Sequence, residues 1–395
     1  MKNNDLERQL DDLLSESIAM AKERAKLTFD RLADPFADRI ILFGAGGLGR
    51  RTLAGLLKVG IEPLAFADNN PKLWKTKING INILSPVDAA QRFRENAVFI
   101  VTIWGAGGGH RFEQTQKQLQ ALGCRRVIPF VPLYWKYANI FLPYYGVDLP
   151  HKTLEQADTV RQVFTFWADG ASRKEYLDQV RWRLWFDFKG LLPPVNYEQY
   201  FPSDLFRLSL NDCFVDCGAY NGDTLQNFLK YQNQFVGKVI AIEPDPINYK
   251  ALQEYITTLP AGIKQRITTL QFASGDYRKK IRFTAEGKAS SGANVGGALE
   301  VECVPLDELL KDEAPTFIKM DIEGDELASL IGAQETLRRC TPLLAICVYH
   351  RQQHLWQIPN FIHPVSSSYR FFLRPHNEEG WDLVCYAIPG SRLIS

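Results

Sequence analysis

The sequence predicts an α/β protein with two doubly wound domains, because one succession of strand, glycine turn and helix occurs twice. The first follows an apolar run at 40–43, and the second follows Cys213 to Val215. About 25 residues after each glycine turn begins, a second apolar run ends in an acidic residue, Asp68 or Glu243. This is the order of a Rossmann-like domain, in which parallel strands bind ligands at their carboxyl ends. At 395 residues the chain is also too long for one ordinary core.

Composition and charge exclude several classes of protein. A net charge of +1 argues against a surface that coats nucleic acid and against an anchor for anionic membranes. The first residues lack the apolar core of a signal peptide, and no apolar run is long enough to span a bilayer. The seven cysteines include no Cys-x-x-Cys pair for zinc, so reduced thiols are expected. We therefore expect a cytoplasmic protein with neither a nucleic-acid nor a membrane partner.

Four segments are predicted along the chain. They are an N-terminal amphipathic helix at 1–35, a nucleotide-binding domain at 36–135, a helical, aromatic-rich connector at 136–210 and a second α/β domain at 211–395. Leucines and alanines recur at three-to-four spacing in the first segment, as in an amphipathic helix. Too few heptads are present for a coiled coil, so docking on its own chain is favoured over a homodimer, which stays an alternative.

The connector combines aromatic side chains with a proline-rich end. Trp182 lies in a helix-like stretch, and Pro193 and Pro194 introduce a loop that carries Tyr197 and Tyr200. Aromatic residues in a connector are usually core. We therefore expect interdomain packing here, ahead of a lid that folds over a substrate.

The first domain carries a G-x-G-x-x-G turn between a strand and a helix. Gly44, Gly46 and Gly49 form the turn, and a strand at 64–67 ends in Asp68, so these four residues are the candidate site for a second ligand. Further strands at 97–103 and 126–130 complete the sheet. The segment resembles the nucleotide-binding domain at the front of bacterial sugar O-acyltransferases, which implies a nucleotide or nucleotide-sugar ligand. A purely structural Rossmann unit is an equal alternative, since glycine turns also serve helix–strand packing.

The turn of the second domain differs in charge from the first. Asp216 and Asp223 crowd it, which disfavours a phosphate and suits a cationic ligand such as a sulfonium with an amino group. Glu243 is placed to accept hydrogen bonds from ribose hydroxyls. The sequence therefore predicts a pocket for S-adenosylmethionine. Its candidate residues are Asp216, Gly218, Tyr220, Gly222, Asp223, Thr224, Glu243 and Asp276.

Ionisable residues also gather after two later strands. Lys319, Asp321 and Glu323 alternate along a strand near 316–322, and a strand at 343–348 delivers His350 to the same edge. These four residues are the candidate catalytic group, with His350 or Asp321 as the base that accepts a hydroxyl proton. A His350 that is only a hydrogen-bonded packing residue is an equal alternative. A metal ion held by Asp321 and Glu323 is the less favoured alternative, because two carboxylates without a third ligand are too few, so no metal site is predicted.

The remaining elements complete the second sheet. A strand at 266–273 is expected to bring Asp276 to the adenine, with a carboxylate that serves only the turn as an equal alternative. Strands at 280–285 and 299–304 are interpreted as an inserted pair around a polar loop at 290–294. Two strands joined by a turn, near 369–373 and 381–388, close the chain as an antiparallel hairpin.

Five motifs occur in family order between residues 212 and 388. They are Val-Asp-Cys-Gly-Ala-Tyr-Asn-Gly-Asp-Thr from Val215, Ile-Glu-Pro-Asp from Ile242, Pro-Leu-Asp-Glu-Leu from Pro305, Phe-Ile-Lys-Met-Asp-Ile-Glu-Gly from Phe317 and Val-Tyr-His from Val348. With them the segment resembles the FkbM-type methyltransferases. The first motif departs from the family form at Cys217 and Tyr220, which leaves the cofactor turn intact.

The resemblance implies a class I methyltransferase sheet of seven strands with an antiparallel terminal hairpin. It also implies S-adenosylmethionine as cofactor and a hydroxyl on a sugar, glycan or natural product as acceptor. Two alternatives stay open: an NAD(P)-dependent oxidoreductase that uses the first domain, and a non-catalytic scaffold that binds a nucleotide-sugar. The identity of the acceptor does not follow from the sequence.

Overall fold

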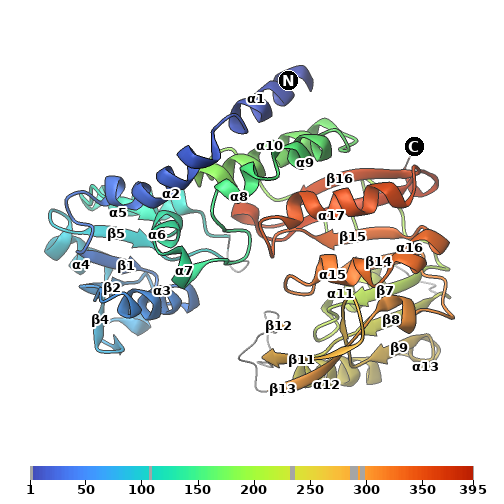
Figure 1. Cartoon of the computed structure of the whole chain (residues 1–395). Helices are drawn as coiled ribbons and strands as arrows, with labels where there is room; N and C mark the ends of the chain where they lie inside the picture. Colours follow the sequence, from blue (N-terminus) through green and yellow to red (C-terminus); the bar gives the residue numbers. More distant parts are fainter. Residues whose placement is uncertain (1–2, 106–108, 232–235, 285–291, 294–298, 395) are drawn as a thin grey trace. The chain divides into compact units, whose positions relative to one another are not determined.

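The computed structural model describes residues 3–105, 109–231, 236–284, 292–293 and 299–394, which divide into two compact units (Figure 1). Unit 1 comprises Met1–Ala157, Leu177–Pro193 and Asn377–Trp381; unit 2 comprises Asp158–Tyr176, Pro194–His376 and Asp382–Ser395. The predicted connector is therefore shared between the units. In the described residues no helix is both long and apolar enough to cross a membrane, and all seven cysteines are free thiols.

Unit 1 is built on a six-stranded sheet with the order β3-β4-β2-β1-β5-β6. Its strands are β1 (Ile40–Phe43), β2 (Ala65–Ala67), β3 (Lys77–Ile78), β4 (Ile81–Leu84), β5 (Val98–Val101) and β6 (Val127–Pro129). All neighbours are parallel except β3 and β4. Those two form a hairpin that the sequence analysis missed, at Asn79 and Gly80, whose φ angles of 48° and 85° suit a tight hairpin turn.

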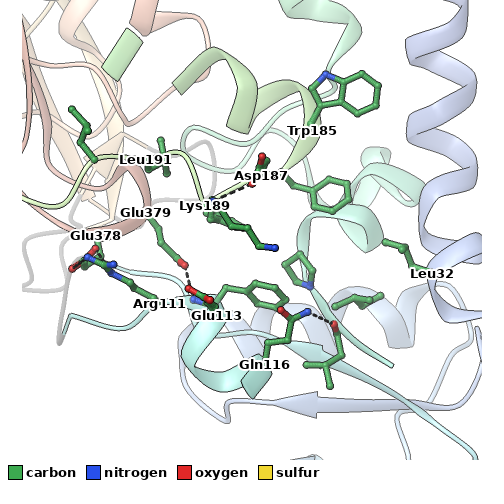
Figure 2. A pocket seen from close by; sticks show the side chains of 17 residues that line it. Leu32, Arg111, Glu113, Gln116, Trp185, Asp187, Lys189, Leu191, Glu378 and Glu379 are labelled. Carbon is green, nitrogen blue, oxygen red and sulfur yellow. Dashed lines mark hydrogen bonds and ion pairs between the residues drawn. The ribbon is translucent and has the colours of Figure 1, made fainter. Parts of the chain in front are cut away.

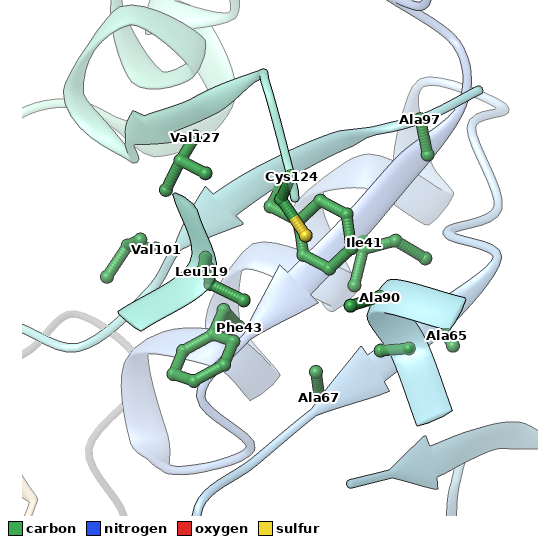
Figure 3. Close-up of a cluster of buried hydrophobic side chains, with 12 residues drawn as sticks. Ile41, Phe43, Ala65, Ala67, Ala90, Ala97, Val101, Leu119, Cys124 and Val127 are labelled. Carbon is green, nitrogen blue, oxygen red and sulfur yellow. The ribbon is translucent and has the colours of Figure 1, made fainter. Parts of the chain in front are cut away.

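Helices α3 (Gly47–Lys58), α4 (Pro86–Phe93) and α5 (Phe112–Ala121) connect the parallel strands. Figure 3 shows the core on one face of the sheet, where alternate residues of a strand such as Ile41 and Phe43 meet Ala90 of α4 and Leu119 of α5. The alternate residues Ile40 and Leu42 are buried on the opposite face of the sheet. Strand β1 is therefore apolar at every position.

The N-terminal segment is two helices, α1 (Asn3–Leu13) and α2 (Ile18–Ala33), where a single one was predicted. Ser17 restarts the helix, because its side chain accepts a hydrogen bond from the Met20 N–H at 3.2 Å. Leu6 and Leu10 are 3% and 1% exposed, so the helix does dock on its own chain.

Short helices and aromatic rings complete unit 1. The helices are α6 (Val131–Lys136), α7 (Ala138–Phe141), α8 (His151–Leu154) and part of α10 (Gly170–Trp185), while α9 (Ala157–Phe164) falls almost wholly in unit 2. Trp104 lies at the centre of an aromatic cluster, with ring centroids 5.6 Å from Trp182 and 4.7 Å from Trp381. The tryptophan of the connector is therefore core, as expected.

Unit 2 contains a seven-stranded sheet with the order β16-β17-β15-β14-β7-β8-β9. Its strands are β7 (Cys213–Cys217), β8 (Lys238–Ile242), β9 (Ile267–Leu270), β14 (Phe317–Met320), β15 (Leu343–Cys347), β16 (Tyr369–Pro375) and β17 (Leu383–Pro389). Only β17 runs opposite to the other strands, and it pairs antiparallel with both β15 and β16, which confirms the predicted fold and its terminal hairpin. Strand β7 lies between β14 and β8, so the turn after β7 meets the ends of both neighbours.

Helices connect the strands of unit 2. They are α11 (Asp223–Lys230), α12 (Pro246–Thr257), α13 (Ala261–Lys264), α14 (Leu306–Leu309), α15 (Glu326–Ile331), α16 (Gln334–Cys340) and α17 (His354–Ile362). Two of them matter for the site. Helix α11 follows the glycine turn, and α15 begins just after the acidic end of β14.

One predicted strand is divided between two sheets. The ladder of β9 ends at Leu270, and β10 (Ala273–Ser274) pairs instead with β13 (Leu299–Val304) in a four-stranded sheet, order β10-β13-β11-β12. Strand β11 (Lys279–Thr284) pairs antiparallel with β13, as predicted for the inserted pair, and β12 (Gly292–Ala293) joins it. Residues 290, 291 and 294 of the polar loop lie outside the described residues.

Candidate active site

The turn after β7 is packed so tightly that only glycine fits its first position. Gly218 has a φ of 80°, and a Cβ placed there would lie 2.0 Å from the carbonyl oxygen of Asp321. The backbone of the glycine turn therefore touches the end of β14 directly. Gly222, with a φ of 92°, then begins α11.

A buried ion pair supports this turn from within the sheet. Lys319 Nζ lies 2.9 Å from Asp216 Oδ1, both side chains being at most 2% exposed, and it donates to the Gly218 carbonyl at 2.7 Å. Burial raises the pKa of Asp216 to about 6, against the opposing charge of Lys319. Burial alone would lower the pKa of Lys319, but Asp216 and Asp321 raise it. Lys319, predicted as catalytic, is thus placed to fix the turn.

Glu243 follows β8 and faces the same turn. Its carboxylate accepts the Tyr220 N–H at 2.8 Å and the Asp245 N–H at 2.9 Å, one on each oxygen. Burial raises its pKa to about 7, although both amide hydrogen bonds act in the opposite direction. Each carboxylate oxygen retains a second lone pair, so the group can still accept hydroxyl donors.

Asp321 follows β14 and is partly exposed, with a side chain 26% exposed against 19% for Glu323. Two tyrosines orient it: Tyr200 donates to Oδ2 at 2.7 Å and Tyr349 donates to Oδ1 at 3.4 Å. The Tyr200 ring also lies over Lys319, with Nζ 5.2 Å from its centroid. A partly exposed, oriented carboxylate is suited to accept a proton from a bound hydroxyl.

His350 is buried among three carboxylates. Nδ1 lies 2.7 Å from Glu326 Oε1, and Nε2 lies 3.4 Å from Asp321 Oδ1 and 3.7 Å from Glu323 Oε1. Burial alone would lower its pKa, but the charge and hydrogen bond of Glu326, with Glu323 and Asp321, raise it to about 10. The three carboxylates therefore favour the protonated form of the His350 imidazole.

Glu326 joins a second histidine to this cluster. Its Oε2 lies 3.1 Å from His354 Nδ1. Burial alone would raise the pKa of Glu326, but the charge and hydrogen bond of His350, with those of His354, lower it well below its usual range. Glu323, between the strand and α15, has a left-handed φ of 56° and precedes Gly324 at 107°.

The sequence that forms these strand ends is similar to that of a known enzyme family. Residues 216–372 match the family model described as the methyltransferase FkbM domain. They form an FkbM methyltransferase domain. The methyl donor of this domain is S-adenosylmethionine.

Comparison with solved structures extends the likeness of fold. The structure of methyltransferase FkbM from Methylobacillus flagellatus KT has a TM-score of 0.77 and 24% identity, covering 98% of this chain and 99% of that chain. Shorter matches are UDP-D-quinovosamine 4-dehydrogenase from Vibrio fischeri (25% identity, 23% and 74% covered, TM-score 0.19) and Aeropyrum pernix fibrillarin with bound S-adenosyl-L-methionine (11%, 46% and 69%, 0.27). These two are too partial to carry an argument. No curated protein matches the chain.

The glycine turn and Glu243 are chemically suited to the donor of the FkbM domain. The carboxylate of Glu243 is fixed at a strand end with lone pairs left for ribose hydroxyls, and Gly218 keeps side chains out of the turn. Asp216 was expected to face the cationic cofactor, but its side chain is buried inside the sheet and forms an ion pair with Lys319. Asp223, at the start of α11, is exposed and accepts the Thr224 N–H at 2.7 Å.

Asp276 does not follow a strand of the seven-stranded sheet, contrary to the prediction. It comes after β10 of the four-stranded sheet, and its carboxylate pairs with Lys279 at 2.8 Å. The cause is the break in the ladder after Leu270, which the sequence of the predicted strand at 266–273 did not reveal.

Three residues that lie close to Asp321 or His350 were not predicted as site residues. Tyr200 was interpreted as core, and neither Glu326 nor His354 was selected as a site residue. A four-residue spacing between His350 and His354 was the available signal, because that spacing often places two histidines on one side of a helix. Helix α17 begins only at His354, so one helix does not carry both.

In the glycine turn of unit 1, as in the FkbM domain, a carboxylate that follows the second strand accepts hydrogen bonds from two backbone amides. Asp68 Oδ2 accepts the Ala45 N–H at 2.7 Å, and its Oδ1 accepts the Asn70 N–H at 2.7 Å. A Cβ on Gly49 would lie 2.0 Å from the Gly44 carbonyl oxygen, whereas one on Gly46 would meet nothing within 4 Å. The turn is thus closely packed against its own helix and open at Gly46.

Unit 1 also contains a cavity of about 350 Å³ at the start of α5. Arg111 pairs with Glu378 through two contacts of 2.7 and 2.9 Å, and Glu379 accepts the Phe112 N–H at 2.5 Å. Figure 2 shows the Lys189 side chain pointing into this space. None of the four residues predicted for a second ligand lines this cavity.

Proposed function

We propose that the protein transfers a methyl group from S-adenosylmethionine to a hydroxyl group of a sugar, glycan or natural product. The observation that carries this proposal is the Asp321 carboxylate, partly exposed and oriented by Tyr200 and Tyr349. A neutral hydroxyl is a weak nucleophile and benefits from a base within hydrogen-bond reach. His350 is 1% exposed, so an acceptor reaches Asp321 more readily.

S-adenosylmethionine would supply an electrophilic methyl group on a sulfonium. The acceptor oxygen would bond to the methyl carbon, the carbon–sulfur bond would break to release S-adenosylhomocysteine, and the hydroxyl proton would be lost. In our proposal Asp321 takes that proton on Oδ2, in the position where the Tyr200 hydroxyl now donates. Glu243 binds the ribose, and Lys319 holds the Gly218 turn against the end of β14. Alignment of the two reactants supplies most of the acceleration.

Glu243→Ala tests the donor pocket. We expect S-adenosylmethionine to bind roughly 10- to 100-fold more weakly, because hydrogen bonds from hydroxyls to a charged carboxylate are lost. Calorimetric titration of the full chain measures this effect. Glu254→Ala, on the exposed side of α12, is the control with unchanged affinity. Undiminished binding in the Glu243 variant would remove the pocket assignment.

We further propose that unit 1 binds a nucleotide or nucleotide-sugar at the turn from Gly44 to Gly49. The supporting observation is that Asp68, held by two backbone amides, lies beside an open Gly46 at the uncapped start of α3. Free amides at a helix N-terminus attract phosphate.

UDP-glucose is the probe for this second proposal, titrated against the full chain and against Asp68→Asn. We expect binding by the natural chain and a loss of roughly tenfold or more in the variant, since ribose contacts to a charged carboxylate are strong. Glu95→Gln, exposed on the same unit, is the control. Binding of NADH in place of UDP-glucose would favour the oxidoreductase alternative. Binding of neither ligand would indicate that the Rossmann-like domain has only a structural role.

A further inference from the structure

We propose that His350, Asp321 and Glu323 bind a divalent cation of borderline character, such as Mn²⁺ or Zn²⁺, on the acceptor side of the FkbM domain. The proposal starts from the convergence of unlike ligands. His350, Asp321 and Glu326 offer nitrogen and oxygen atoms that all lie within 4.8 Å of one another, and Glu323 Oε1 adds a further oxygen 3.7 Å from His350 Nε2. The sequence alone had offered two carboxylates without a third ligand.

The distances around His350 Nε2 resemble those between ligands of one ion. Asp321 Oδ1 and Glu323 Oε1 lie 3.4 and 3.7 Å from this nitrogen. Both separations exceed an N–H···O hydrogen bond of about 2.7–3.2 Å. Ligands bound at about 2.0–2.2 Å from one cation lie about 3.0–3.6 Å apart. Small movements of the half-buried Glu323 side chain would complete the set.

Glu326 orients the imidazole in the manner of a second-shell carboxylate. Its Oε1 contacts Nδ1 at 2.7 Å, which directs the opposite ring nitrogen, Nε2, toward Asp321 and Glu323. Ligand histidines usually donate their other ring nitrogen to a carboxylate in this way. Glu326 itself is fixed by the Ile322 N–H at 3.1 Å and by His354.

Charge and ligand type indicate the class of ion. Three carboxylates surround one imidazole, while the neighbouring Lys319 is already paired with Asp216. Mixed imidazole and carboxylate ligands favour Mn²⁺ or Zn²⁺ over Ca²⁺. A cation here would neutralise the cluster and lower the pKa of an acceptor hydroxyl, a role that rests on the proposed function.

The test is titration of the chelator-treated full chain with Mn²⁺ alone, followed by electron paramagnetic resonance of the free ion. We expect one Mn²⁺ per chain, binding weakened at least about 100-fold in His350→Ala, and weakened about 10- to 100-fold in Glu326→Gln. His363→Ala, at an exposed histidine, is the matched control with unchanged binding. Should His350→Ala fail to fold by circular dichroism, Glu323→Gln replaces it, with an expected loss of about tenfold or more.

Absence of saturable Mn²⁺ binding, or binding that all these variants retain, would overturn the cation site. Because the titration contains no S-adenosylmethionine, this failure is distinct from failure of the proposed function. Methyl transfer that persists in chelator would likewise overturn only the cation. Loss of donor binding in calorimetry would overturn only the donor pocket.

Discussion

Asp321→Asn is expected to lower kcat for methyl transfer by about 10²–10⁴-fold, the contribution typical of a general base. Asparagine can still accept the Tyr200 hydrogen bond, but it cannot take up a proton. Donor affinity should stay within about threefold, since Glu243 and the Gly218 turn are unchanged. The rate is measured at saturating S-adenosylmethionine, on an acceptor found by screening sugars, glycans and natural products with a labelled methyl group.

Two further variants provide a control and a comparison for this experiment. Asp312→Asn changes a carboxylate that is 85% exposed and should leave the rate unaltered. Tyr200→Phe removes one orienting hydrogen bond and should cost about tenfold, which is less than the loss of the carboxylate itself. A rate for Asp321→Asn within about fivefold of the natural chain would exclude Asp321 as the base.

Lys319→Met is expected to reduce the free energy of unfolding by about 3–5 kcal/mol, because it leaves the buried Asp216 carboxylate without its partner. The double variant Asp216→Asn with Lys319→Met should recover much of this loss, since no buried charge remains. Recovery is incomplete because the Gly218 carbonyl loses its donor. Urea unfolding of the full chain, followed by a probe in unit 2, provides the measurement.

Lys279→Met is the matched control for the buried pair. Lys279 and Asp276 also form an ion pair, at 2.8 Å, but both side chains are about one-third exposed. Its loss should cost at most about 1 kcal/mol, as for other surface pairs. Equal effects of Lys279→Met and Lys319→Met would show that burial of the Asp216 pair contributes nothing.

The parallel core of both units could be predicted from the sequence because its strands are mostly apolar and its turns need glycine. Ile40–Phe43 and Phe317–Met320 are buried along their whole length, and each leads into a turn that contains glycine. The Asn79–Gly80 hairpin was missed because β3 is only two residues long. The break after Leu270 was missed because pairing with β13, distant in sequence, decides it.

The candidate site could be predicted only in part. Strand order brought Asp216, Lys319 and His350 to one edge, but it could not distinguish a residue that reaches the ligand from one that supports it. Lys319 and Asp216 turn inward to each other, which depends on burial rather than on strand alternation. Beyond Met320 the strand ends, so alternation says nothing about how Asp321 and Glu323 point.

Glu323 shows how selection for stability and selection for activity oppose each other in this chain. Its φ of 56° lies in the left-handed region, which glycine adopts readily but which costs a glutamate backbone strain of order 1 kcal/mol. A library screened only for thermal resistance would therefore tend to enrich Glu323→Gly. The same substitution removes a carboxylate from beside His350, so thermostabilised homologues of this chain would be expected to be poorer catalysts.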